Sequence, residues 1–215
     1  MFCPACGFTG PFKEYGKTKR ANAMCPKCKS LERQRGMYLF IENMTKKALA
    51  NILYISPPEC FSSKLYDDPN LNYHTIDVDP NRSDVRYLMD VCRLAYPNSF
   101  FDLIICYGVL NKVKYDDKAL IEMKRVLSAS GTIILDSPHD MEKTKTNKIS
   151  ESDEKYYFKK GIEYRKYGKD LLIKMNILGF DADIIRFGDV IKPEQLIECN
   201  INPDDTILVC RRNTA

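Results

Sequence analysis

The sequence predicts an α/β protein whose mostly parallel sheet is covered by helices on both faces, preceded by a small cysteine-rich module. Three observations support this fold class. Two Cys-x-x-Cys pairs lie within the first 28 residues, strand-like and helix-like stretches alternate from residue 30 onward, and the strand-like stretches are apolar at nearly every position. Near-continuous apolar runs are typical of parallel strands that are buried on both faces.

Length and composition limit the class of protein. A chain of 215 residues fits one domain, or one domain with a small attachment. With 44% hydrophobic residues, the chain can bury a sizeable core. No apolar run approaches the ~18–20 residues of a membrane span, and the first residues lack the pattern of a signal peptide. We therefore expect a soluble, cytoplasmic protein without a membrane partner.

The charge is distributed unevenly along the chain. Residues 1–50 carry a net charge of +7, whereas residues 51–215 carry −3. A basic front favours an anionic partner such as RNA. The alternative is an ordinary solvated surface that is rich in lysine.

The four N-terminal cysteines have the spacing of a metal site. Cys3 and Cys6 form one pair, and Cys25 and Cys28 form the second after eighteen residues, with room for a short hairpin between them. Two such turns supply four thiolates for a tetrahedral Zn²⁺, and neither a disulfide nor a redox pair explains the pattern as well. Zinc would add folding free energy to a segment of ~30 residues. The module is either structural or a reader of RNA or protein.

The rest of the chain predicts alternating elements. A helix begins after Ser30 as N-cap and reaches residue 49, with Leu31, Tyr38, Ile41 and Leu49 on its inner face. Strands are expected at 52–55, 73–78, 84–90, 99–108, 132–138, 181–187 and 205–212. Further helices are expected at 60–65, 116–130 and 167–179, with Gly131 ending the second. The polar stretch 139–160 predicts a lid or excursion, and 188–203 predicts a long hairpin connection.

Several stretches together resemble a known family. They are "CPKCKSLERQR" at 25–35, "ILYISP" at 52–57, "MDV" at 89–91, "FDLIICYGVLNKV" at 101–113, "DDKALIEMKRVLSASGTIIL" at 116–135 and "RKYGKDLLIKMNILGF" at 165–180. They resemble the class I S-adenosylmethionine-dependent methyltransferases, and more narrowly the bacterial type 11 group that begins with a zinc knuckle. The resemblance implies a Rossmann-like, doubly wound, seven-stranded sheet with a C-terminal antiparallel hairpin. It also implies a zinc knuckle over residues 1–29 and a methyltransferase-like domain over 30–215.

The resemblance implies a site for S-adenosylmethionine at the carboxyl ends of the strands, where the strand order reverses. Asp77 would accept the ribose hydroxyls, with Asp79 as its substitute, and Asp90 with Val91 would contact the adenine. Turn capping is the alternative role for these aspartates. The other expected cofactor contacts are Ser56, Pro57 and Pro58 in a loop without glycine, then Cys106, Tyr107, Gly108 and Leu110.

The resemblance fails at several polar positions. The family usually reads H-V-L-E-H where this chain has residues 108–112, "GVLNK", and Ile162 and Glu163 replace its Asp-His pair. Glu163 and His139 are candidate general bases, which would add ~10²–10⁴-fold to the rate; a surface role is the alternative for both. Arg165 and Tyr167 would grip an anionic or sugar-like group, or else anchor their loop.

Three functions are compatible with these features. The first is methyl transfer to a small-molecule or glycan-like acceptor, with S-adenosylmethionine as cofactor and Zn²⁺ as a structural metal. The second is an RNA methyltransferase that presents RNA through the basic zinc-binding front. The third is a binding protein that kept the fold without the catalysis, which the altered polar positions favour.

Overall fold

The computed structural model describes residues 1–45, 51–61, 71–136, 143–148 and 163–213. The chain divides into two compact units. Unit 1 comprises Met1–Leu49, Pro58–Asn72 and Ile184–Ile207, and unit 2 comprises Ala50–Pro57, Tyr73–Asp183 and Leu208–Ala215. The boundary expected after residue 29 falls inside unit 1, and it stays a prediction.

Unit 1 consists of a short hairpin and helices. Its elements are β1 (Lys13–Tyr15), β2 (Arg20–Met24), α1 (Glu32–Thr45), the 3-10 turn η1 (Glu59–Phe61), α5 (Phe187–Val190) and α6 (Pro193–Glu198). The antiparallel pairing of β1 with β2 confirms the hairpin between the two cysteine pairs. Tyr38 and Ile41 are buried as predicted, whereas Leu49 lies outside the described residues. Gly36 leaves room for Phe187, since a Cβ there would lie 2.5 Å from that ring.

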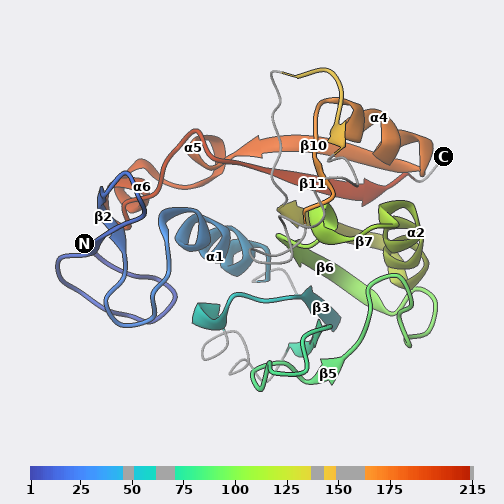
Figure 1. Cartoon of the computed structure of the whole chain (residues 1–215), viewed down its shortest axis with the longest axis horizontal. Coiled ribbons are helices and arrows are strands. Elements are labelled where there is room, and N and C mark those ends of the chain that lie inside the picture. The colour runs from blue at the N-terminus through green and yellow to red at the C-terminus, as the bar shows by residue number, and fades with distance from the viewer. Residues whose placement is uncertain (46–50, 62–70, 137–142, 149–162, 214–215) are drawn as a thin grey trace. The chain divides into compact units, whose positions relative to one another are not determined.

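A seven-stranded sheet has the order β10-β11-β7-β6-β3-β4-β5 (Figure 1). The strands are β3 (Asn51–Ile55), β4 (Asn72–Asp77), β5 (Tyr87–Leu88), β6 (Phe101–Tyr107), β7 (Leu127–Asp136), β10 (Phe180–Arg186) and β11 (Thr206–Arg212). β3 pairs with β6, β6 with β7 and β4 with β5 in parallel, whereas β11 runs antiparallel to β7. Because the chain adds β4 and β5 on one side of β3 and then β6 and β7 on the other, the sheet is doubly wound, as predicted.

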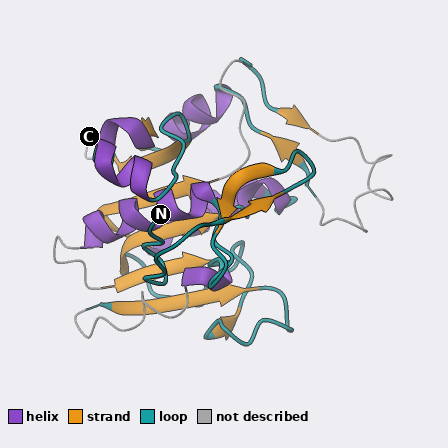
Figure 2. Cartoon of the chain, turned by 90° about the vertical axis from the view of Figure 1, so that its left-hand side faces the viewer, coloured by secondary structure: helices purple, strands orange, loops and turns teal. Residues whose placement is uncertain are grey.

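The remaining elements of unit 2 are η2 (Leu110–Lys112), α2 (Asp116–Val126), α4 (Asp170–Ile177) and the short strands β8 (Asn147–Lys148) and β9 (Arg165–Lys166). β8 and β9 pair with each other and not with the large sheet (Figure 2). α2 buries Ala119, Leu120, Met123 and Val126, which share one helical face. α4 ends before Gly179, whose φ of +78° suits the predicted helix stop.

Two expectations about the elements are wrong. The helix expected at 116–130 ends at Val126, because Leu127 already pairs with Phe101 in the sheet. Gly131 is therefore a strand residue, and it makes room for Leu127, whose side chain would lie 2.6 Å from a Cβ at that position. The connection 188–203 joins the neighbouring strands β10 and β11, and it contains most of α5 and all of α6. No helix of the described residues is long and apolar enough to span a membrane.

Candidate functional site

The cysteine site consists of Cys3, Cys6, Cys25 and Cys28 in unit 1. Their four Sγ atoms all lie within 4.8 Å of one another. The Cys3–Cys28 and Cys6–Cys25 sulfurs are 3.5 and 3.6 Å apart. Tetrahedral coordination at a Zn–S distance of about 2.3 Å requires sulfurs about 3.8 Å apart, so the four side chains fit a zinc ion.

The side chain of Ser30 contacts the cysteine site and does not cap the helix. Its hydroxyl lies 3.2 Å from the sulfurs of both Cys3 and Cys28. The first turn of the helix is supported instead by Gln34, whose side-chain oxygen accepts a hydrogen bond from the Leu31 amide at 2.9 Å. The predicted role of Ser30 as N-cap is therefore wrong, because its side chain is turned toward the thiols.

Arg35 is a fully buried cation that ties distant parts of unit 1 together. Its guanidinium donates to the carbonyls of Ala23 (2.9 Å), Ser30 (2.8 Å), Cys199 (2.6 Å) and Asn200 (3.0 Å). Burial lowers the pKa of this guanidinium, and the negative charge of the nearby Cys3 opposes that shift. Because Arg35 follows the second cysteine pair closely, it joins the cysteine site to the segment around α6.

The strand-end pocket of unit 2 is a cavity of about 330 Å³ at the carboxyl ends of four parallel strands. It is lined by Ile55 and Ser56 after β3, by 77–79 and Arg82 after β4, by 89–91 after β5, and by Gly108, Val109, Lys112 and Val113 after β6. Ligands in open α/β sheets bind at such strand ends, where the strand order reverses. The cavity therefore lies where the sequence predicted the cofactor.

Asp77 lines the strand-end pocket, and two neighbouring side chains hold its carboxylate in place. The Ser56 hydroxyl donates to its carboxylate at 2.8 Å, and Arg82 donates to the same oxygen at 3.1 Å. Arg82 also contacts Asp84 at 2.6 Å and the Pro57 carbonyl at 2.7 Å. The arginine beside Asp84 holds the pKa of that carboxyl below its usual value. Arg82 could not be predicted from the sequence, because an arginine five residues beyond a strand has no distinctive pattern.

Two backbone positions shape the mouth of the strand-end pocket. Ser56 takes a left-handed φ of +53°, the conformation for which glycine is usually chosen. Gly108 has a φ of +61°, and a Cβ built on it meets nothing within 4 Å. The Gly108 position thus faces open space in the pocket, which fits the close approach expected there for a ligand.

The predicted cofactor residues divide into two groups. Those that line the strand-end pocket are Ser56, Asp77, Asp79, Asp90, Val91 and Gly108. The others do not line it. The Pro57 carbonyl accepts a hydrogen bond from Arg82, and the Pro58 carbonyl accepts one from the Phe61 amide. Tyr107 ends β6, and Cys106 and Leu110 are fully buried. Cofactor contact stays a prediction for every member of both groups.

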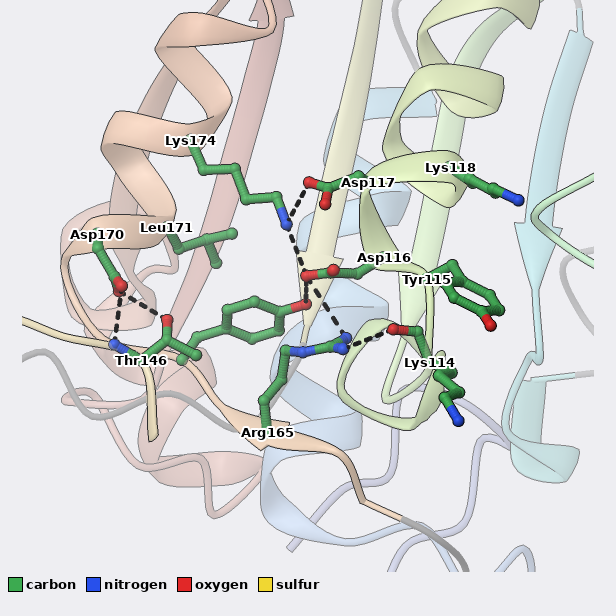
Figure 3. A pocket seen from close by; sticks show the side chains of 11 residues that line it. Lys114, Tyr115, Asp116, Asp117, Lys118, Thr146, Arg165, Asp170, Leu171 and Lys174 are labelled. Carbon is green, nitrogen blue, oxygen red and sulfur yellow. Dashed lines mark hydrogen bonds and ion pairs between the residues drawn. The ribbon is translucent and has the colours of Figure 1, made fainter. Parts of the chain in front are cut away.

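A second cavity of about 440 Å³, here called the Asp116 cavity, lies at the start of α2 (Figure 3). The buried Asp116 carboxylate accepts from the Tyr167 hydroxyl and from Lys174, both at 2.8 Å, and lies 3.4 Å from Arg165. Burial opposes ionisation of Asp116, but the hydrogen bonds from Lys174 and Tyr167 outweigh it and lower its pKa. Burial, followed by the charge of Asp116, raises the pKa of Tyr167.

Arg165 fastens the segment before α4 to the loop after β6. Its guanidinium donates to the carbonyls of Leu110 (3.2 Å), Val113 (2.6 Å) and Lys114 (2.9 Å). The Tyr167 hydroxyl also contacts the Leu110 carbonyl at 3.3 Å. These contacts correspond to the loop-anchoring alternative for the two residues, because their polar atoms are already engaged by the protein.

The two candidate bases have different outcomes. Glu163 accepts a hydrogen bond at 3.1 Å from the amide of the buried Asn111 in η2. His139 lies outside the described residues, as does most of the expected lid at 139–160. Sequence reasoning did not foresee the Asn111–Glu163 pair, since 52 residues separate its members.

Comparison with known proteins shows which fold the chain shares. Residues 61–135 match the model of a methyltransferase domain family. A SAM-dependent methyltransferase from Archaeoglobus fulgidus aligns over 86% of this chain and 96% of its own, with a TM-score of 0.58 at 13% identity. The chain therefore has the fold of the class I methyltransferases. No curated protein matches the sequence.

Two more solved structures show how far this fold is shared. A 1,6-didemethyltoxoflavin-N1-methyltransferase from Burkholderia thailandensis, solved with S-adenosylhomocysteine, aligns over 84% of this chain and 78% of its own (TM-score 0.56, 12% identity). The [4+2]-cyclase SpnF aligns over 98% and 89% (TM-score 0.54, 15% identity). Because a cyclase has this fold too, the methyltransferase fold alone does not determine the reaction.

Proposed function

We propose that the chain is an S-adenosylmethionine-dependent methyltransferase that binds its cofactor in the strand-end pocket and acts on a small-molecule acceptor, a glycan-like one included. The observation that carries the proposal is the convergence of four parallel strand ends on one cavity, with a carboxylate, Asp77, at the end of the second. The open position beside Gly108 supports it, since a ligand can approach the backbone there.

The residues of this chain would act chiefly by positioning. Bound S-adenosylmethionine supplies an activated methyl group on a sulfonium sulfur. Asp77, oriented by Ser56 and Arg82, would accept hydrogen bonds from the ribose hydroxyls. Asp90 and Val91 would contact the adenine at the end of β5. Holding the reactants in line contributes most of the rate in such a reaction, so a dedicated base is not required for every acceptor.

We further propose that the cysteine site holds one structural Zn²⁺. The sulfur separations support this assignment, and Ser30 lies within hydrogen-bonding distance of two of the four ligands. The proposed role is to stabilise unit 1, since Arg35 links the segment after the cysteines to Cys199 and Asn200. An RNA-presenting role for the basic front is the second candidate, and the +7 charge of residues 1–50 favours it.

The test is calorimetric titration of S-adenosylhomocysteine into zinc-loaded protein. We expect micromolar affinity for the wild type and a loss of about 10-fold or more for Asp77→Asn, because a charge-assisted hydrogen bond is removed. Asp183→Asn is the matched control, since Asp183 is an exposed carboxylate of unit 2 paired with Arg211. Absence of binding to the folded wild type would favour the binding-protein alternative instead.

A further inference from the structure

Three lysines lie in the loop between β6 and α2 and in the first turn of α2. Lys112, Lys114 and Lys118, here called the lysine strip, are all exposed. Within the parts of the chain that the structure describes, none of them forms a salt bridge. By contrast, Lys174 and Arg165 in the same neighbourhood are paired with Asp116. The strip is therefore a source of uncompensated positive charge.

The lysine strip borders both cavities of unit 2. Lys112 lines the strand-end pocket, whereas Lys114 and Lys118 line the Asp116 cavity. The acidic side chains of the Asp116 cavity are already engaged: Asp116 and Asp117 by Lys174, and Asp170 by Thr146. The cavity lining holds four cations and three carboxylates, so an anion that enters this region meets a small net positive charge, which the lysine strip supplies.

An exposed aromatic ring lies within the lysine strip. Tyr115 is 58% exposed, so its ring is accessible to a ligand. The Lys118 ammonium lies 5.0 Å from the ring centroid. In Figure 3 the polar ends of Lys114, Tyr115 and Lys118 are all turned away from Asp116. Lysines interleaved with an exposed aromatic ring suit phosphate and base recognition, because the ring offers a stacking face.

We propose that the lysine strip binds a nucleotide unit of the methyl acceptor, with Lys114 and Lys118 contacting phosphate and Tyr115 stacking on the base. This inference rests on the proposed methyltransferase function, because it assigns the acceptor class to side chains beside the cofactor pocket. Because Lys112 lines the strand-end pocket, an acceptor bound along the lysine strip would reach the cofactor there. The nucleotide is either free or part of a single-stranded RNA.

The test compares two probes on the same protein. Uridine monophosphate is titrated by calorimetry, and a fluorescein-labelled ten-nucleotide RNA of mixed sequence is titrated by anisotropy at several salt concentrations. The variants are the double substitution Lys114→Gln/Lys118→Gln and the single substitution Tyr115→Leu. Lys192→Gln, an exposed lysine of unit 1, is the matched control. Binding of S-adenosylhomocysteine is measured in parallel.

We expect the double variant to lose 10-fold or more in affinity for the probe that binds, and Tyr115→Leu to lose about 5-fold or more, since stacking on one base is worth about 1–3 kcal/mol. For RNA, the slope of log K against log salt falls by about 1.4, or about 0.7 for each lost phosphate contact. Binding of the mononucleotide identifies a free nucleotide acceptor, and binding of RNA alone identifies an RNA acceptor.

Two results would overturn the inference. One is that neither probe binds a wild-type protein that binds S-adenosylhomocysteine normally. The other is that Lys192→Gln weakens binding as much as the double variant does. Failure of the proposed function gives a different pattern, namely absence of S-adenosylhomocysteine binding whatever the probes do. We expect both glutamine variants to retain wild-type affinity for S-adenosylhomocysteine, because their lysines line only the Asp116 cavity or lie in unit 1.

Discussion

The cysteine site and the strand-end pocket are built in different ways. The cysteine site is encoded locally, since two Cys-x-x-Cys turns and one hairpin bring four sulfurs within 4.8 Å of one another. The strand-end pocket is encoded by topology, since its lining residues come from four strand ends spread over residues 55–113. The comparison teaches that spacing identifies a metal site directly, whereas a pocket of this kind emerges only once the strand order is known.

Removal of the metal ligands is expected to have the largest effect. Cys25→Ser should abolish stoichiometric zinc and lower the unfolding midpoint by about 10 °C or more, because structural zinc supplies much of the folding free energy of such modules. Metal analysis and thermal unfolding by circular dichroism measure this. Cys92→Ser in unit 2 is the control. A Cys25→Ser protein with full zinc content and an unchanged midpoint would show that the four cysteines do not hold a structural zinc ion.

The next effect concerns the buried cation of unit 1. Arg35→Met should cost about 3–5 kcal/mol of unfolding free energy, because four carbonyls lose their donor. Arg35→Lys should recover only part of it, since one ammonium cannot reproduce the planar fork. Urea denaturation at constant zinc measures both, with the exposed Arg20→Met as control. Equal stability of the Lys variant and the wild type would show that charge alone is needed.

A smaller effect is expected at Arg165, which anchors the loop after β6 that lines the strand-end pocket. Arg165→Met should reduce stability by about 2–3 kcal/mol and weaken S-adenosylhomocysteine binding by about 10-fold, because the loop that carries Gly108–Val113 loses its anchor. Urea denaturation and calorimetry measure the two quantities, with the exposed Arg211→Met as control. If the destabilised variant binds S-adenosylhomocysteine with wild-type affinity, the position of this loop does not affect cofactor binding.

The smallest effect concerns pH. His74 is surrounded by Tyr96, Phe100 and Phe101, with ring centroids 5.3–5.5 Å away, and neither ring nitrogen has a hydrogen-bond partner among the described residues. Burial, and then the charge of Arg86, lower its pKa. The unfolded chain therefore binds a proton more readily, so this contribution to stability is present above about pH 6.5 and is lost as the pH falls below it.

His74→Phe removes that titration. Between pH 7.5 and pH 5.5, the unfolding midpoint of the wild type should fall by about 2–4 °C more than that of the variant, which corresponds to about 1 kcal/mol in a chain of this size. Thermal unfolding at the two pH values measures the difference. Parallel changes in the two proteins would show that folding does not lower the pKa of His74.

Much of the fold could be predicted because its signals are local. Apolar runs located the strands, and their residue types indicated parallel pairing, as in the alignment of Ile52–Ile55 with Leu103–Cys106. The end of α2 was missed because residues 127–130 continue a helix-like pattern, and only pairing with β6 makes them a strand. Pairing across the sheet is a long-range contact that helical periodicity does not contain.

The site could be predicted only in part for a related reason. Asp77, Asp90 and Gly108 follow strands, so their shared pocket follows from the topology. Arg82 and Arg35 could not be assigned, because each acts through carbonyls or carboxylates that the fold brings near. For Arg35 the partners Cys199 and Asn200 lie 164 and 165 residues away. Residue type and spacing therefore reveal ligands of a metal more readily than the cations that hold a loop in place.

The most direct test of the central claim is amide hydrogen exchange of the zinc-loaded protein with and without saturating S-adenosylhomocysteine. We expect slower exchange in peptides that cover residues 77–79, 89–91 and 106–113, and little change over residues 1–28. Protection confined to other segments, or unchanged exchange at a concentration that saturates calorimetric binding, would contradict the assignment of the strand-end pocket as the cofactor site.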